Sequence, residues 1–196
     1  MKHYFTDNTD LKSEQSQFIF RFHKYDLLFT SDNGVFSKSM IDYGSRVLLD
    51  NIEITNEKTL LDVGCGYGTF GICLNKAYSH LNVDMVDVND RALELAKLNA
   101  KNNNIHANIY KSFIYENVQG SYDVIVTNPP VRAGKEVVTT ILQESIEHLN
   151  ENGSLWVILQ KKQGAPSAKK KMEEVFGNCE IVKRDKGYYL LHSVKR

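Results

Sequence analysis

Residues 60–71 read Leu-Leu-Asp-Val-Gly-Cys-Gly-Tyr-Gly-Thr-Phe-Gly, and this stretch decides the predicted fold. A short apolar strand, Thr59 to Val63, leads into a loop with glycines at Gly64, Gly66 and Gly68, and a helix is expected to follow. Glycine suits a loop whose backbone turns sharply close to a ligand, because a Cβ atom would collide there. The helix would direct its free N–H groups and the positive end of its dipole at the loop. The stretch therefore predicts a binding loop for a cofactor that carries adenosine.

Two cofactors fit this loop. Gly66-x-Gly68-x-x-Gly71 matches the dinucleotide fingerprint, and Asp87 follows at roughly the expected ~20 residues, so the spacing alone is compatible with NAD. However, Asp62 and the additional Gly64 precede the fingerprint, so that the loop reads Asp-x-Gly-x-Gly-x-Gly. A carboxylate near the loop suits a ligand with an ammonium and a sulfonium group, and it would repel a pyrophosphate. The loop therefore favours S-adenosylmethionine.

Length and composition predict one globular domain. The chain has 196 residues, with 24 lysines and arginines against 24 aspartates and glutamates. Its first residues are polar and no apolar run approaches the ~20 residues that cross a membrane, so we expect no signal peptide, no membrane partner and a cytoplasmic location. The cysteines Cys65, Cys73 and Cys179 form no CxxC pair, which favours reduced thiols over disulfides or a metal site.

The zero net charge hides a basic C-terminal part. Residues 151–196 carry ten lysines and arginines against five acidic residues, whereas residues 1–150 carry 14 against 19. A basic end on a neutral protein is one sign of nucleic-acid binding. An ordinary solvated face explains the run Lys169-Lys170-Lys171 equally well, so this sign is weak on its own.

Strand and helix patterns alternate as in a doubly wound α/β fold. We assign residues 1–34 to an N-terminal tail and β-hairpin (Gln17–Thr30), and residues 35–196 to a Rossmann-like domain whose last strand is antiparallel. The strands predicted in this domain are Thr59–Val63, Leu81–Val86, Ala107–Tyr110, Tyr122–Thr127, Ser154–Gln160, Asn178–Lys183 and Tyr188–Val194. The predicted helices are Asp42–Asn51, Thr69–Tyr78, Asp90–Asn102, Val137–Leu149 (ending near the turn signal Asn152-Gly153) and Ala165–Phe176.

A second motif, Asn128-Pro129-Pro130, directly follows the apolar strand Tyr122–Thr127. Ligands bind at the carboxyl ends of such strands. Consecutive prolines lack N–H groups and fix φ, so the motif is rigid and extended. The Asn128 amide and the Pro129 carbonyl would then project as fixed acceptors, and an NH₂ group could donate to both with its lone pair turned towards an incoming methyl group. A stiff turn is the alternative, which the position opposite a glycine-rich loop makes the weaker one.

With these motifs the chain resembles the class I S-adenosylmethionine-dependent methyltransferases, and within them the group that methylates amines with Asn-Pro-Pro. It is most similar to the small-domain family of ribosomal RNA guanine-N2 methyltransferases of the RsmC type. The motifs that carry the resemblance are Gly34-Val35-Phe36-Ser37, Asp42-x-Gly44-Ser45, Leu61 to Gly68, Asp87-Val88-Asn89, Asn128-Pro129-Pro130 and Gly187-Tyr188. The glycine loop is specific only for the cofactor, whereas Gly-Val-Phe-Ser together with Asn-Pro-Pro is more specific for the family.

The resemblance implies roles for the matched residues. Those expected around the methionyl part of the cofactor are Asp62, Gly64, Cys65, Gly66 and Gly68, with Cys65 as a small packing residue and no nucleophile. Asp87 would accept both ribose hydroxyls and Val88 would pack on the adenine. Phe36 and Ser37 would close over the cofactor or target pocket. The residues expected to hold the target amine beside the cofactor are Asn128, Pro129 and Pro130.

Three departures from the family pattern affect the substrate side. Ser112-Phe113 stands where many relatives have an acidic residue for the adenine amino group, so Ser112, a backbone carbonyl or packing by Phe113 would replace it. Val131 occupies a position that is aromatic in many relatives and stacks on the acceptor. The two-domain guanine enzymes also carry a degenerate N-terminal copy of the domain, so substrate recognition here would use self-association as a homodimer or the basic C-terminal part.

Cationic residues near the two motifs are candidates for phosphate contacts. Arg132 and Lys135 directly follow Asn-Pro-Pro, and we rate them above Lys161, which follows a later strand end and could equally be a solvated loop lysine.

These features predict methyl transfer from S-adenosylmethionine to an exocyclic amine, with guanine N2 of 16S ribosomal RNA as the expected acceptor and the small ribosomal subunit as a partner. No metal is required. The alternatives are an Asn-Pro-Pro methyltransferase acting on a protein glutamine, adenine or a small amine, and a non-catalytic RNA- or ribosome-binding module that retains the cofactor fold. An NAD oxidoreductase is a distant third, because no acid or base for hydride chemistry accompanies the loop.

Overall fold

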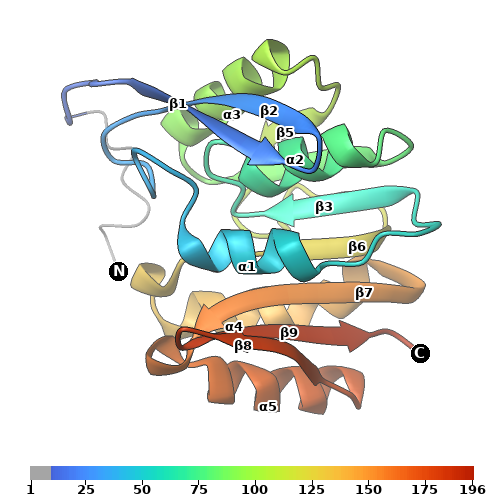
Figure 1. The fold of residues 1–196 in the computed structure, drawn as a ribbon. Coiled ribbons are helices and arrows are strands. Elements are labelled where there is room, and N and C mark those ends of the chain that lie inside the picture. The colour runs from blue at the N-terminus through green and yellow to red at the C-terminus, as the bar shows by residue number, and fades with distance from the viewer. Residues whose placement is uncertain (1–9) are drawn as a thin grey trace.

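The computed structural model describes residues 10–196, and the part of the predicted tail before residue 10 lies outside it. Its main feature is a seven-stranded sheet (Figure 1). In sheet order the strands are β5 (Asn108–Lys111), β4 (Asn82–Asp87), β3 (Thr59–Val63), β6 (Tyr122–Thr127), β7 (Leu149–Gln160), β9 (Tyr188–Val194) and β8 (Glu180–Asp185). All neighbours are parallel except the two pairs that contain β9. The predicted doubly wound sheet with an antiparallel last strand is confirmed.

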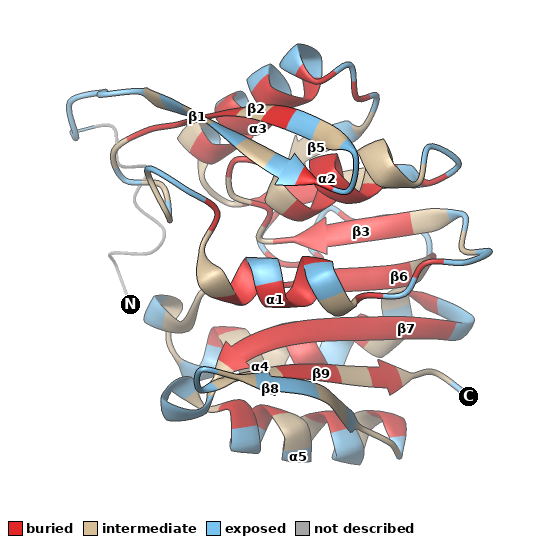
Figure 2. Cartoon of the chain, in the orientation of Figure 1, coloured by how far each residue is buried: buried red, intermediate tan, exposed pale blue. Residues whose placement is uncertain are grey.

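Helices pack on both faces of this sheet because alternate strand residues point to opposite sides. Leu60 joins the apolar core under α1 (Tyr43–Asn51), α2 (Thr69–Ala77) and α3 (Asp90–Asn102), whereas its neighbour Leu61 joins the core under α4 and α5. Helix α4 spans Lys135–Glu144 and α5 spans Ala165–Phe176. The central strands are buried over most of their length (Figure 2), as expected for a sheet covered on both faces.

The predicted N-terminal hairpin is present as β1 (Ser16–Phe22) and β2 (Tyr25–Ser31), which form a separate antiparallel pair. Its aromatic face packs against the glycine-loop side of the sheet: the rings of Phe18 and Phe29 lie 5.8 Å apart, and each forms an edge contact with Tyr67. Phe29 is fully buried while Ile19, on the other face of the hairpin, is 69 % exposed. The hairpin therefore extends the core that α2 and α3 share.

Two helices near the site begin at side-chain caps. Asp42 accepts a hydrogen bond from the Ser45 amide at the start of α1, and Asn89 accepts one from the Ala92 amide at the start of α3. Such caps satisfy backbone donors that a helix leaves free in its first turn. They therefore set the positions of Asp42 and Asn89 at the same edge of the sheet as the strand ends.

The prediction around Asn152-Gly153 was wrong. Helix α4 ends at Glu144, a short 3₁₀ turn (Ser145–His148) follows, and β7 begins at Leu149, so the Asn-Gly pair lies inside a twelve-residue strand. A Cβ atom on Gly153 would lie 2.9 Å from the carbonyl oxygen of Tyr122, at the place where the β6–β7 register shifts. Gly153 therefore marks a β-bulge. Among the described residues no helix is long and apolar enough to cross a membrane.

Candidate active site

The glycine loop lies over the end of strand β4. The amides of Gly64 and Cys65 both donate to the carbonyl oxygen of Val86 at 2.9 Å. Gly64 and Gly66 have φ of +71° and +55°, a region that L side chains rarely adopt. A Cβ atom on Gly66 would meet no atom within 4 Å, so the loop leaves open space beside its backbone. The sequence thus builds a backbone surface that a ligand can approach closely.

The later glycines serve packing. Helix α2 starts after Gly68, which provides no side-chain cap, so the helix N–H groups face the loop. A Cβ atom on Gly71 would lie 2.4 Å from the sulfur of Met85, so only glycine lets α2 pack this close to β4. The close packing also brings the Gly71 amide within 3.1 Å of Asp62 Oδ2.

Asp62 is a buried carboxylate with an unsatisfied oxygen. It is 1 % exposed, and its Oδ1 has no hydrogen-bond partner among the described residues. Burial, with a smaller contribution from the charge of Asp87, raises the pKa of Asp62 to about 7. A buried acceptor without a partner is costly unless a ligand satisfies it. This arrangement fits a cationic ligand on the glycine loop.

Asp87 ends β4 beside the same loop. Its Oδ2 accepts from the Gly66 amide at 2.8 Å and its Oδ1 accepts from the Asn89 amide at 2.9 Å. Burial raises the pKa of Asp87, while these backbone donors act in the opposite direction. Because a carboxylate has about four lone-pair sites, these backbone donors leave Asp87 with acceptor capacity for a hydroxyl group such as those of a ribose.

An open cleft lies at the carboxyl ends of β3, β4 and β5. It brings together six residues expected around the cofactor or target: Gly64, Asp87, Val88, Ser112, Phe113 and Pro130. Sequence reasoning missed Ile114, Val137 and Ile141, which also line it, because apolar residues in a loop and on a helix face read as ordinary core positions.

The Ser112 hydroxyl is used within its own turn. It donates to the Ile114 carbonyl at 2.9 Å and accepts from the Asn117 amide at 3.1 Å. The neighbouring Phe113 is 38 % exposed and borders the cleft. Of the replacements considered for the missing acidic residue, this geometry favours apolar packing by Phe113.

The amide of Asn128, just past the end of β6, is held from the side of α1. Its nitrogen donates to Asp42 Oδ2 at 3.3 Å and to Ser45 Oγ at 3.2 Å. A carboxylate can only accept, so the nitrogen must face Asp42 and Oδ1 faces away from it. The sequence analysis gave Asp42 and Ser45 no such role, because they appeared there only as part of the motif Asp42-x-Gly44-Ser45 and of the predicted helix Asp42–Asn51.

The predicted substrate-side residues that follow β6 and β7 lie at this same edge. Val131 and Arg132 belong to a 3₁₀ turn (Val131–Ala133) after Asn-Pro-Pro, and Lys135 begins α4. Lys161 begins another 3₁₀ turn after β7. The side chains of Arg132, Lys135 and Lys161 are exposed.

Phe36 and Ser37 lie on a loop that the glycine loop anchors. The Tyr67 hydroxyl, between two of the loop glycines, donates to the carbonyl oxygens of Ser37 at 3.2 Å and Met40 at 3.4 Å. Phe36 and Met40 are nevertheless 67 % and 59 % exposed. The backbone is thus fixed while two large apolar side chains face solvent. Tyr67 was missed because a residue between two glycines carries no signal of its own.

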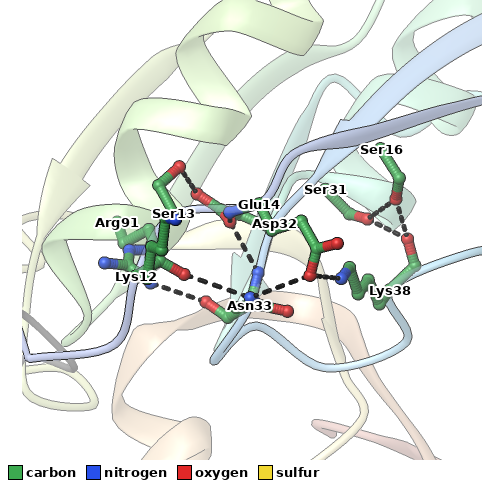
Figure 3. A network of polar contacts seen from close by, with 9 residues as sticks. All are labelled: Lys12, Ser13, Glu14, Ser16, Ser31, Asp32, Asn33, Lys38 and Arg91. Carbon is green, nitrogen blue, oxygen red and sulfur yellow. Dashed lines mark hydrogen bonds and ion pairs between the residues drawn. The ribbon is translucent and has the colours of Figure 1, made fainter.

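A polar network holds this loop from its other end (Figure 3). Buried Asp32 accepts from the Ser13 hydroxyl and the Glu14 amide, both at 2.6 Å. Glu14 pairs with Lys38 at 2.9 Å, and the Lys38 carbonyl accepts from the Ser16 hydroxyl at 2.7 Å. The network joins the segment before β1 to the Phe36 loop.

Cys65 packs inside the glycine loop. It is 6 % exposed, its thiol contacts the Gly66 carbonyl, and burial raises its pKa, none of which suits a nucleophile. All three cysteines are free. Within residues 10–196 no group of three His, Cys, Asp or Glu side chains could hold a metal ion.

Comparison with known proteins agrees with this geometry. The family model "Methyltransferase small domain" matches residues 26–192. An uncharacterized Bacillus subtilis protein, YbxB, is 45 % identical over 99 % of this chain and 98 % of its own length. Ribosomal RNA small subunit methyltransferase C of Vibrio cholerae is 31 % identical over 87 % of this chain, which spans 50 % of that relative.

A solved structure, the Thermus thermophilus 16S rRNA N2 G1207 methyltransferase (RsmC) in complex with AdoMet and guanosine, shares the fold. Its TM-score is 0.85 at 24 % identity, over 95 % of this chain and 52 % of that one. The chain thus spans about half the length of the relatives that carry this enzyme's name. Because the family model covers most of the chain, the protein belongs to the methyltransferase small domain family, which consists of S-adenosylmethionine-dependent methyltransferases.

Proposed function

We propose that this protein transfers a methyl group from S-adenosylmethionine to the exocyclic N2 amine of a guanine in 16S ribosomal RNA. The observation that supports this most is the fixed Asn128 amide at the end of β6, beside a cleft that Asp87 and Gly64 line. The names of the RsmC relatives and of the Thermus enzyme support the choice of acceptor.

When bound, S-adenosylmethionine supplies a methyl group already activated by its sulfonium. The chain's own task is to position the amine. Asn128 Oδ1 and the Pro129 carbonyl oxygen would accept the two amine hydrogens, which turns the nitrogen lone pair towards the methyl carbon. As the N–C bond forms, the S–C bond breaks, and the extra proton on nitrogen leaves to water. Fixing both reactants in this way is the main source of rate acceleration in such a transfer.

The charges of the site match this donor. Asp62 and Asp87 are buried acids beside the glycine loop, and Asp62 Oδ1 lacks a partner among the described residues, as a cationic methionyl group requires. A guanine must leave its stack to reach the site. Val131 offers it little stacking surface, so we assign this role to Phe36, the exposed aromatic ring on the neighbouring loop.

Transfer of radioactive methyl groups tests the proposal. The donor is labelled S-adenosylmethionine, and the acceptors are undermethylated small ribosomal subunits, their purified 16S RNA and their purified proteins. Label recovered as N2-methylguanosine is the expected result. Label in glutamine would support the protein-methylating alternative, because a glutamine amide also presents an NH₂ group.

Calorimetric titration with S-adenosylmethionine, S-adenosylhomocysteine and NAD complements this assay. Binding of the two sulfur compounds but not NAD is expected. Binding without transfer to any acceptor would overturn the enzyme proposal and favour a non-catalytic RNA- or ribosome-binding module.

A further inference from the structure

Tyr43, Arg46 and Lys186 form a cluster, called here the Tyr43 cluster, between the start of α1 and the turn that joins β8 to β9. The Lys186 ammonium lies 4.6 Å from the centre of the Tyr43 ring, and the Arg46 guanidinium lies 5.3 Å from it. The Tyr43 hydroxyl donates to Asp185 at 2.8 Å. Two cations are thus gathered on one aromatic ring whose orientation is fixed.

The Tyr43 cluster adjoins the residues that hold Asn128. Tyr43 lies between Asp42 and Ser45 in the sequence, and these two bind the Asn128 amide. The cofactor cleft lies at the ends of β3, β4 and β5, whereas the β8–β9 turn belongs to the other end of the sheet order. Along this edge, Asn128 therefore separates the cleft from the cluster.

The turn also joins the cluster to Lys161. The Lys161 amide donates to the Gly187 carbonyl at 2.7 Å. The side chains of Arg46, Lys161 and Lys186 are exposed, and no carboxylate among residues 10–196 forms an ion pair with them. In contrast, Lys169 and Lys171 on α5 pair with Glu173 and Glu174. The lysine run Lys169-Lys170-Lys171 is thus partly neutralised, whereas Arg46, Lys161 and Lys186 are not.

Lys186 occupies a backbone position that disfavours it. Lys186 and Gly187 form a two-residue hairpin turn between the paired residues Asp185 and Tyr188, with φ of +44° and +82°. Turns with positive φ at both positions favour Asn or Gly at the first. The turn therefore does not explain why a lysine stands at position 186. An unfavourable backbone position of this kind suggests that the ammonium group has a function.

We propose that the Tyr43 cluster binds the phosphate backbone of the RNA strand next to the target nucleotide. The proposal rests on the proposed function. Exposed cations without carboxylate partners suit phosphate, and such contacts fix the register of an RNA strand without reading its sequence. With Asn128 between the cleft and the cluster, a strand held here would place one nucleotide at the amide.

The substitution Lys186→Asn tests this sharply, because Asn suits the turn and removes the charge. The matched control is Lys24→Asn. Lys24 ends the two-residue β1–β2 turn, and its ammonium lies 5.5 Å from the centre of the Tyr25 ring. Lys76 contacts the same ring and belongs to the last turn of α2, which is the end of this helix remote from the glycine loop. Both variants lose one lysine that contacts a tyrosine.

Filter binding of labelled, undermethylated 16S RNA at several salt concentrations gives the readout. We expect Lys186→Asn to bind the RNA about three- to tenfold more weakly than wild type. The magnitude of the slope of log K against log salt should fall by about one. The double variant Arg46→Gln/Lys186→Asn should lower both the affinity and the magnitude of the slope further. Lys24→Asn is expected to match wild type, and calorimetry is expected to show unchanged S-adenosylmethionine affinity in all three variants.

Two results would overturn the proposal: wild-type binding and slope in Lys186→Asn, or equal weakening in Lys24→Asn, which would indicate an effect of net charge. If wild-type protein methylates 16S RNA while the cluster variants bind it normally, only the cluster proposal fails. If wild-type protein neither binds nor methylates this RNA, the proposed function fails with it.

Discussion

The side-chain nitrogen of Asn128 lies 3.3 Å from Oδ2 of Asp42, so the end of a central strand is joined to the cap of a helix that begins 85 residues earlier in the sequence. The same Asp42 oxygen accepts from the Ser45 amide at 3.0 Å. Because the carboxylate has no proton to donate, the pair excludes the flipped amide of Asn128. The helix cap thereby orients Asn128 so that its Oδ1 would face the proposed target amine.

We predict that Asp42→Asn lowers the methyl-transfer rate constant about tenfold, which corresponds to ~1.4 kcal/mol in the barrier. Asn is as good a helix cap as Asp, so α1 should remain folded. However, an amide at position 42 can donate as well as accept, and the orientation of Asn128 is no longer fixed. Single-turnover methylation measures the rate, and calorimetry should show unchanged cofactor affinity. An unaltered rate would mean that the Asp42 contact is only structural.

Asn128→Ala is predicted to be more severe, with a loss of about 100-fold or more in rate, as for other residues that align a reacting group. The affinity for S-adenosylmethionine should change little, because Asn128 is outside the lining of the cofactor cleft. Turnover and calorimetric titration of the same preparation test both statements. A variant that turns over normally would remove Asn128 from the mechanism.

Local signals were sufficient to predict much of this fold. Strand β6 and helix α3 lie where the sequence predicts them, because the apolar residues 124–126 form the middle of the strand and an Asn cap begins the helix. The glycine loop and the position of Asp87 likewise follow from spacing. Each of these features depends on residues that are close together in the chain.

Other features depend on contacts that a single stretch does not contain. Asn152-Gly153 reads as a helix end, yet the carbonyl of Tyr122 on the adjacent strand and pairing with Lys195 make it a bulge. The role of Asp42 depends on Asn128, and that of Tyr43 on Lys186. In each case the decisive contact is made by a residue far away in the chain, so the local sequence pattern alone does not predict it.

For Asp87 we predict that replacement by Ala weakens S-adenosylmethionine binding about 10- to 100-fold, since a hydrogen bond to a charged group contributes ~1.5–3 kcal/mol. Asp87→Asn should lose less, because one acceptor oxygen remains. Asp87 also accepts from the Gly66 and Asn89 amides, so thermal unfolding must be measured with the titration. Equal affinity of Asp87→Ala and wild type would exclude a ribose contact.

We predict that the raised pKa of Asp62 makes the free energy of unfolding depend on pH. Its pKa is raised from an ordinary value of 3.8 to about 7 in the folded protein, mainly by burial. Between these values the folded chain binds a proton that the unfolded chain lacks, so this group's contribution to stability is greatest at low pH and is lost as pH rises through about 7. Asp62→Asn stays neutral and can still accept from Gly71. Urea unfolding should therefore show the variant gaining stability relative to wild type from pH 5.5 to pH 8.

We also predict that the Asp62 carboxyl group releases a proton when the cofactor binds. A cationic ligand favours the ionised form of Asp62, so binding should lower its pKa and expel a proton at pH values near 7. Calorimetric titrations in two buffers with different ionisation enthalpies measure that release. In Asp62→Asn the binding enthalpy should no longer depend on the buffer. If wild type already shows no such dependence between pH 6 and 7, Asp62 does not exchange a proton on binding, and the ligand's positive charge lies elsewhere than at the unsatisfied Oδ1.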